Sequence, residues 1–530
     1  MKKAIKYLAM AALAMTIGAC SSEDSELAQQ PVENNGMITI TGKLAPKSAL
    51  TRALSEGVDN DSKNIIVAKW AEGETLAVVF SSDASQREMG KATITEVDPN
   101  TGAATFVCNV ENGTLITKKP ECTIIYPYKA AYDDATGVKT YPEFLGLQDG
   151  TLSNNLDVRV GKGVISDLVG SVGEATATLT VTQQPEPQYA IFKFTLTSNS
   201  SNIQASVFTV KGNGGLITTV LPTSMYELYV ALPPDTKGGS NYTFMVSDGL
   251  KTYTKTMYNS ASAIEKGVYY ETPLEMGEGV DSKVDLAKLS IGNGGTYTVN
   301  DLDVLTGTLN KYVKISIPDG ATVVLNNATI NGTNDVSCAW AGLTCEGNAT
   351  IILKGTNSVK GFYNAHPGIR VPDQSTLTIQ GSNYDELVAS SNGYGAGIGG
   401  GNNLHSGNIV IEGGKITATG GAGAAGIGGG GNANCGNITI TGGIIDATGG
   451  AGAVGIGSGS SNDNSSACGK ITIANTVSRV TSKTDAKPAT YLLGASTGGH
   501  CGTITIGGTV REQDSFRTTD FPGSEYNYLP

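Results

Sequence analysis

Histidine, tryptophan and positive charge are scarce in this chain of 530 residues. It contains 3 His and 2 Trp, and its 36 Lys and Arg residues against 48 Asp and Glu residues give a formal net charge of −12. So few histidines leave little material for imidazole catalysis or for zinc sites. A net negative chain also repels the phosphate backbone of nucleic acids. We therefore expect no metal, no cofactor and no nucleic-acid partner.

Long apolar runs are also missing, apart from one near the start of the chain. This run extends from Tyr7 to Gly18 behind three lysines, and it is shorter than the ~20 residues that a helix needs to cross a bilayer. It ends in Ile17-Gly18-Ala19-Cys20, which resembles a bacterial lipobox, with Cys20 as the lipidated residue. A plain signal peptide with an incidental cysteine is the alternative. We predict a lipoprotein signal peptide over residues 1–19.

The residues that follow form a polar segment. Ser21–Glu26 is acidic, and the chain stays polar to residue 35. An acidic run directly after a lipidated cysteine resembles a tag that sends lipoproteins to the outer face of the outer membrane, and a solvated tether is the other interpretation. We assign residues 20–35 to an acidic and polar tether. The expected location is the outer membrane and the cell surface, with the lipid on Cys20 as the anchor.

Helical periodicity is nearly absent from the next 240 or so residues. Short runs alternate there between apolar and polar residues, with Gly, Asn, Pro and Asp between them, which is typical of antiparallel strands. The clearest runs are Met37–Thr41, Thr75–Phe80, Thr176–Val181, Ile191–Leu196 and Tyr226–Leu232. This length is large for one sandwich. We predict two β-sandwiches, at residues 36–165 and 166–280.

A repeat of about 29–33 residues occupies the chain from residue 281. Segments of the form Gly-x-Ile-x-Ile begin at residues 407, 436, 469 and 502, and Gly-Ile pairs begin at 368, 397, 426 and 455. Three short strands per repeat form one coil of a parallel β-helix, with isoleucines stacked inside. The Gly-Ile-Gly-Gly-Gly segments at 397–401 and 426–430 are expected at corners that need a positive φ. We predict an all-β fold that ends in a parallel β-helix over residues 281–530.

Seven cysteines follow Cys20. Cys435, Cys468 and Cys501 recur every 33 residues in one column of the predicted coils, either as a ladder of buried thiols or with one neighbouring pair bridged. The other candidate disulfides of an exported protein are Cys108 with Cys122 and Cys338 with Cys345. The first pair flanks a hairpin-like stretch and the second closes a short loop, so both roles are structural.

The two predicted sandwiches carry a series of short motifs in order. These motifs are Thr51-Arg52, Trp70–Val78, Ile125–Tyr128, Leu228–Pro234 and Gly267–Tyr270. Behind a lipobox, this order resembles the fimbrillin family, the lipoprotein subunits of type V pili and their adhesin relatives. The resemblance covers about 240 of the 530 residues. It implies two transthyretin-like β-sandwiches.

The resemblance also implies a route to polymerisation. In the family, an arginine-specific protease removes the first strand, and a strand of a neighbouring subunit fills the groove. Arg52, after the predicted strand Met37–Thr41, is the candidate cleavage site, and an ordinary surface arginine is the alternative. The chain departs from the simple pilin pattern because Gly267–Met276, the counterpart of the family's C-terminal donor strand, runs into the predicted β-helix. This indicates a tip or accessory subunit, or a non-polymerising adhesin, with other fimbrial subunits as candidate partners.

An enzyme is the rival hypothesis, because polysaccharide lyases and hydrolases also use parallel β-helices. Their chemistry needs clustered carboxylates, with a base in the lyases. The alignment of the coils places Gln380 beside Glu412 and Thr417 beside Asp446, so no column stacks acids with a base. We therefore predict no catalytic residue and a non-enzymatic adhesin or minor fimbrial subunit.

The predicted coils present flat faces of Thr, Asn, Ser and Gly, which suit sugar or protein surfaces through many weak contacts. Trp340 and Tyr394 are candidates to stack on sugar rings, with a buried or loop position as the alternative for each. Because the anchor is at the sandwich end, we expect the β-helix to lie distal to the membrane. The expected ligands are glycans or surface proteins of the host or of other bacteria.

Overall fold

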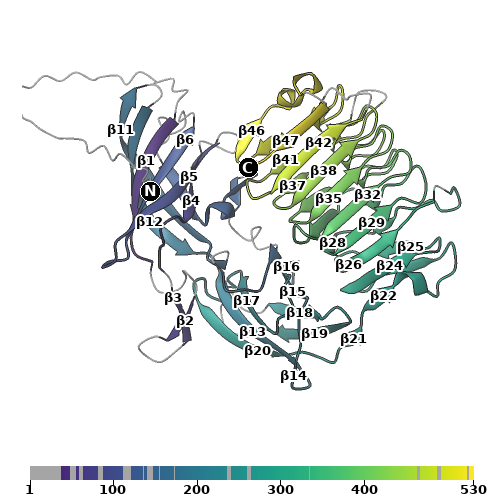
Figure 1. The fold of residues 1–530 in the computed structure, drawn as a ribbon, viewed down its shortest axis with the longest axis horizontal. Coiled ribbons are helices and arrows are strands. Elements are labelled where there is room, and N and C mark those ends of the chain that lie inside the picture. The colour runs from purple at the N-terminus through teal and green to yellow at the C-terminus, as the bar shows by residue number, and fades with distance from the viewer. Residues whose placement is uncertain are drawn as a thin grey trace, which may run out of the picture.

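The computed structural model contains three β-rich units in one chain (Figure 1). The described residues are 37–47, 55–58, 64–67, 69–81, 87–111, 121–134, 137–139, 147–153, 156–171, 174–235, 240–258, 264–333, 335–461, 466–485, 491–521 and 524–530. The predicted signal peptide, Cys20 and the tether lie outside these ranges. Helical elements within them are short 3-10 turns: η1 (Tyr128–Ala130), η4 (Leu286–Lys288), η5 (Gln513–Phe516) and η6 (Thr518–Asp520). The predicted all-β class is confirmed. No helix of these ranges is long and apolar enough to cross a membrane.

The first unit is a closed barrel. Its strands are, in order around the barrel, β1 (Met37–Leu44), β12 (Glu174–Pro187), β11 (Arg159–Ser171), β7 (Glu121–Tyr126), β4 (Thr75–Ser81), β5 (Arg87–Val97) and β6 (Ala104–Glu111). Two hairpins accompany it, β2 (Ser55–Val58) with β3 (Asn64–Val67) and β8 (Tyr132–Asp134) with β9 (Gly137–Lys139). Alternate side chains of the barrel strands point inward, as the period of two predicted, and they form one apolar core.

The second unit is a sandwich of two sheets. One sheet has the order β10 (Leu147–Gln148), β16 (Gly215–Val220), β15 (Val207–Gly212), β18 (Asn241–Ser247), β19 (Lys251–Tyr258) and β21 (Val280–Asp281). The other contains β14 (Ser201–Asn202), β13 (Ala190–Ser198), β17 (Glu227–Leu232) and β20 (Tyr269–Glu275). An aromatic cluster around Phe194, Phe208 and Phe244 fills the space between the sheets.

The predicted boundary between these units at residue 165 is wrong. Residue 165 lies inside β11, which pairs with β7 on one side and β12 on the other. Strand β12 then pairs with β1, so the barrel closes only when the chain has reached Pro187. The boundary therefore falls between β12 and β13, because a barrel needs all its strands to satisfy their backbone hydrogen bonds.

The third unit, which we call the coil region, begins after β21 and consists of stacked coils whose strands pair in parallel. The first ladder contains β22 (Lys283–Asp285), β24 (Asp303–Leu309), β26 (Ala321–Ile330), β28 (Ala349–Lys354), β31 (Thr376–Gln380), β34 (Asn408–Ile411), β37 (Ile438–Ile440), β41 (Ile471–Ile473) and β45 (Ile504–Ile506). The second ladder continues from β26 through β29 (Thr356–Lys360), β32 (Glu386–Ser390), β35 (Lys415–Thr419), β38 (Ile444–Gly449) and β42 (Arg479–Thr484). The third contains β23 (Thr296–Thr298), β25 (Lys314–Ile317), β27 (Leu343–Cys345), β30 (Ile369–Arg370), β33 (Ile398–Gly399), β36 (Ile427–Gly428), β39 (Ile456–Gly457) and β43 (Leu493–Gly494). A short pair, β40 (Ala467–Cys468) and β44 (His500–Cys501), lies beside them.

The isoleucine columns read from the repeats are the core of the coil region. Ile409 pairs with Ile438 in the first ladder, and Ile398 pairs with Ile427 in the third. Nearer the start of the first ladder, Leu377 pairs with Ala349. The corner at Gly428 has φ +130°, as expected for this glycine-rich turn. The last coil is covered by two antiparallel strands, β46 (Thr509–Arg511) and β47 (Glu525–Tyr528).

The coil region does not project freely from the first two units, and its position relative to the membrane stays a prediction. Near its first coils, Val304 and Val324 pack with Val207 and Met245 of the second unit in one buried apolar cluster. At its other end, β46 contacts β5 of the barrel (Figure 1). Contacts at both ends therefore turn the coil region back along the first two units.

Candidate functional site

The first strand of the barrel, β1, occupies a place between two strands that lie far away in sequence. It runs antiparallel to β6, from Met37 opposite Glu111 to Leu44 opposite Ala104, and parallel to β12 on its other side. Without β1, the facing edges of β6 and β12 would both present unpaired backbone groups.

The side chains of β1 hold it in this place. Ile38, Ile40 and Leu44 are at most 1% exposed in the barrel core, and the burial of each stabilises the strand by about 1.5–3 kcal/mol. Gly42 faces Phe106 so closely that a Cβ atom at this position would lie 2.3 Å from the ring. Position 42 therefore requires glycine in the present packing.

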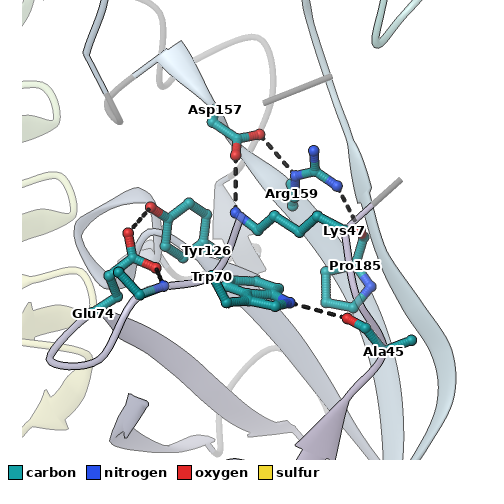
Figure 2. Close-up of polar contacts among 9 residues, drawn as sticks. Ala45, Lys47, Trp70, Glu74, Tyr126, Asp157, Arg159 and Pro185 are labelled. Carbon is teal, nitrogen blue, oxygen red and sulfur yellow. Dashed lines mark hydrogen bonds and ion pairs between the residues drawn. The ribbon is translucent and has the colours of Figure 1, made fainter. Parts of the chain in front are cut away.

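The segment after β1 is fixed by polar contacts. The Ala45 N–H donates to Gln184 Oε1 at 3.0 Å. Trp70 Nε1 donates to the Ala45 carbonyl at 3.0 Å (Figure 2). Two residues further on, the Lys47 side chain turns inward and is only 1% exposed. The N-terminal segment therefore has a second buried anchor, the Lys47 side chain, after the end of β1.

Lys47 ends in a cage formed by Trp70, Tyr126 and Asp157, which we call the Lys47 cage (Figure 2). Its Nζ atom lies 3.8 Å from the centroid of the Trp70 ring and 3.9 Å from that of Tyr126. The two rings meet edge to face, with centroids 5.4 Å apart. Nζ also lies 3.0 Å from Asp157 Oδ2, and the Asp157 side chain is fully buried. Among the described residues, two aromatic faces and one carboxylate oxygen thus surround a desolvated ammonium group.

Further contacts orient the Lys47 cage. Arg159 Nε donates to the second carboxylate oxygen, Asp157 Oδ1, at 2.8 Å, and Arg159 also points to the Pro185 carbonyl. The Tyr126 hydroxyl donates to Glu74 Oε1 at 3.2 Å (Figure 2). A buried carboxylate between two cations is stable only with such hydrogen bonds.

The sequence identified only part of this arrangement. Trp70, Glu74 and Tyr126 belong to motifs that carry the fimbrillin resemblance, but no pattern connected them with Lys47, Asp157 or Arg159. The predicted cleavage site, Arg52, lies outside the described residues, five positions after Lys47. Its cleavage therefore stays a prediction.

A second candidate site is a groove in the coil region, of about 560 Å³. It runs across the turns that join the second ladder to the third, and its lining includes Asn364, Tyr394 and Asp485. Tyr394 is 48% exposed. The floor of the groove is nearly free of side chains, because neighbouring turns contact each other through glycine backbone. A Cβ atom on Gly421 would lie 1.7 Å from the Gly393 carbonyl oxygen.

Of the two aromatic candidates, only Tyr394 is placed for stacking. The Trp340 ring packs on Phe362, with centroids 5.6 Å apart, and is partly buried against the apolar core of the coil region. This packing favours the buried alternative for Trp340. Tyr394 keeps an accessible ring at the edge of the groove.

Two acidic residues of the coil region, Glu412 and Asp446, are each paired with a residue of an adjacent coil. Gln380 Nε2 donates to Glu412 Oε2 at 2.7 Å, and burial raises the pKa of Glu412. Asp446 accepts from Arg479 at 2.7 Å. In the part of the chain that the structure describes, no group of three or more His, Cys, Asp and Glu side chains is placed to hold a metal ion.

The cysteines of both candidate pairs are free thiols in this structure. Cys108 lies on β6 and Cys122 on β7, which do not pair with each other, so the expected hairpin is wrong. Cys338 and Cys345 are buried in the core of the coil region. Burial raises the pKa of Cys108 and of Cys122 to about 12. Thiols with such pKa values are poorly reactive at neutral pH.

The predicted cysteine column is present at the side of the coils. Cys435 pairs with Cys468, and Cys468 pairs with Cys501, all in register. All three are free thiols, and burial followed by the neighbouring thiols raises the pKa of Cys468. The ladder of thiols is therefore the arrangement in this structure.

No protein-family model matches the chain, and no curated protein matches it. Among solved structures, it is similar to a fimbrial protein from Bacteroides ovatus ATCC 8483, at 10% identity and a TM-score of 0.20 over 47% of this chain and 50% of that one. It is also similar to a "putative cell adhesion protein" from Bacteroides fragilis NCTC 9343, at 12% identity and a TM-score of 0.25 over 44% and 92% of the two chains. A protein of the same description from Bacteroides ovatus ATCC 8483 matches at 15% identity and a TM-score of 0.21 over 47% and 98%. Such low TM-scores establish neither a shared overall arrangement nor a function.

Proposed function

We propose that this protein is a non-enzymatic surface adhesin or minor fimbrial subunit whose first strand is exchanged. In this proposal, a protease cuts after Arg52, β1 leaves the barrel, and a strand of a neighbouring subunit takes its place. The observation that carries the proposal is the position of β1: it closes the barrel between β6 and β12, and the connection to the rest of its unit passes through Arg52. A strand added in this gap pairs with the free backbone N–H and C=O groups of β6 and of β12 at the same time.

The end of the second unit supports an accessory role over a shaft role. Strand β20 pairs in parallel with β13, and Leu274 and Met276 are buried in the core of the second unit. The chain then continues directly into the coil region. A strand held at both ends is poorly suited to donate itself to a further subunit. We therefore propose a tip or accessory subunit, anchored at Cys20 in the outer membrane until it is processed.

We assign ligand contact to the coil region. The groove beside Tyr394 combines one accessible ring with polar groups and a floor of glycine backbone. Such a shallow polar surface suits glycans, which bind through ring stacking and many hydrogen bonds. A polysaccharide lyase or hydrolase is the second candidate, and turnover of a glycan that Glu412→Gln or Asp446→Asn abolishes would favour it.

The test of strand exchange is the N-terminus of the protein on intact cells. After treatment with an arginine-specific protease, we expect a new N-terminus at Ala53 together with oligomers, and Arg52→Gln should prevent both. Arg511→Gln is the matched control, because it removes the same charge from an exposed position in the coil region. Monomers that keep the original N-terminus after treatment would contradict the proposal.

A further inference from the structure

The Lys47 cage divides between the part of the chain that a cut after Arg52 releases and the part that remains. Lys47 itself lies on the released side. Trp70, Tyr126 and Asp157 lie on the remaining side: Trp70 before β4, Tyr126 at the end of β7 and Asp157 just before β11. Strand exchange therefore empties the cage without dismantling it.

We propose that the Lys47 cage is a recognition site for a lysine carried by the strand that replaces β1. This inference rests on the proposed function, and it names the chemistry of the partner. The partner is an extended segment of another subunit that ends in an alkylammonium side chain.

The chemistry of the cage selects a positive charge. Its walls are two aromatic faces less than 4 Å from the bound nitrogen, and its end is a fully buried carboxylate. Ring faces and carboxylate all attract a cation. A neutral side chain in this place would leave one oxygen of Asp157 buried without its present cation, which is costly in a dry environment.

The cage also favours lysine over arginine. A guanidinium group binds a carboxylate best through two parallel hydrogen bonds. Here Arg159 already donates to Asp157 Oδ1 at 2.8 Å, so the cation of an incoming strand can reach only Asp157 Oδ2. A single acceptor between two rings fits the compact ammonium group of lysine.

The register of β1 gives the remaining features of the partner strand. Positions equivalent to Ile38, Ile40 and Leu44 must be apolar, because they point into the barrel core. The position of Gly42 must be glycine, because of the close approach to Phe106. The lysine must follow three residues after the last apolar position, which is the spacing from Leu44 to Lys47.

The experiment follows exchange in the full mature chain after a cut at Arg52. The cut protein is chased with an excess of a synthetic peptide of residues 37–47, and mass spectrometry measures the release of the original fragment and the uptake of the peptide. We expect a Lys47→Met peptide to bind at least about tenfold more weakly than the native peptide. A Lys43→Met peptide is the matched control, because Lys43 is exposed on the same strand, and it should bind like the native peptide.

The outcomes separate this inference from the proposed function. Equal binding of the Lys47→Met and Lys43→Met peptides would overturn the lysine site but leave strand exchange intact. Failure of the native peptide to enter the barrel during a long chase would overturn strand exchange, and the lysine site with it.

Two further variants probe the selectivity of the cage. A Lys47→Arg peptide should bind more weakly than the native peptide, and equal binding would contradict the preference for lysine. Asp157→Asn in the full chain should reduce the difference between the native and Lys47→Met peptides. If that variant does not fold, the comparison of peptides on the native protein still decides the question.

Discussion

The barrel and the coil region bury their apolar residues in different ways. In the barrel, β1 contacts β6 and β12, which are about 65 and 135 residues away in sequence. In the coil region, each strand contacts its equivalents in the coils before and after it, about 30 residues away. A strand of the barrel can therefore be exchanged as a unit, whereas loss of a strand from the coils leaves the strands of both adjacent coils in that ladder without their partner. This comparison leads to four predictions.

The largest effect is expected at a corner of the coils. Gly428 has φ +130°, and a Cβ atom there would lie 2.0 Å from the Gly457 carbonyl oxygen in the next coil. Gly428→Ala should destabilise the coil region by several kcal/mol, because the backbone of two coils must move apart. Urea unfolding followed by circular dichroism measures the loss. Gly294→Ala is the control: its φ is +83°, but nothing lies within 4 Å of the added atom, so a cost of about 1 kcal/mol is expected.

The next prediction compares two buried isoleucines directly. Ile427→Ala in the coils and Ile40→Ala in β1 each remove a fully buried side chain, and each should cost about 2–5 kcal/mol in the uncut protein. After β1 has been replaced by a native peptide, the cost of Ile40→Ala should disappear, while that of Ile427→Ala should remain. Calorimetry before and after exchange measures both. A lasting cost for Ile40→Ala would show that β1 had stayed in the barrel.

A smaller effect is expected on binding at the groove. Tyr394→Ala should weaken glycan binding about two- to tenfold, as expected for the loss of one stacking contact. Its effect on stability should be within about 0.5 kcal/mol, because the side chain is half-exposed. Glycan-array binding is the measurement. Tyr384→Ala, at a side chain that is 93% exposed outside the groove, is the control and should bind normally.

The smallest effect concerns the pH dependence of the coils. Burial raises the pKa of Glu412 above 4.5, so between the two pKa values the folded state holds its proton more tightly than the unfolded state. Stability due to this group therefore falls as pH rises through that window. Glu412→Gln removes this partly buried charge, and the variant should exceed the native protein in stability at pH 7, with the difference shrinking toward pH 4. Urea midpoints across this range measure it; a constant difference would contradict the assignment.

Local patterns predicted the strands and the coils well. The alternation in Met37–Thr41 and in Ile191–Leu196 marks observed strands, and the spacing of Ile398 and Ile427 sets their pairing in adjacent coils. The domain boundary could not be found in this way, because β11 and β12 show the same alternation as their neighbours. Which strands close the barrel depends on pairing between segments far apart in the chain.

The sequence by itself determined the all-β class and the register of most coils, because both follow from periods that a short stretch of chain contains. Only the tertiary structure decided three other features: the closure of the barrel by β1, the return of the coil region to the barrel, and the burial of Lys47 between Trp70, Tyr126 and Asp157. The physical reason is common to all three. Each depends on contacts between surfaces that exist only after separate segments have folded, so no local pattern contains them.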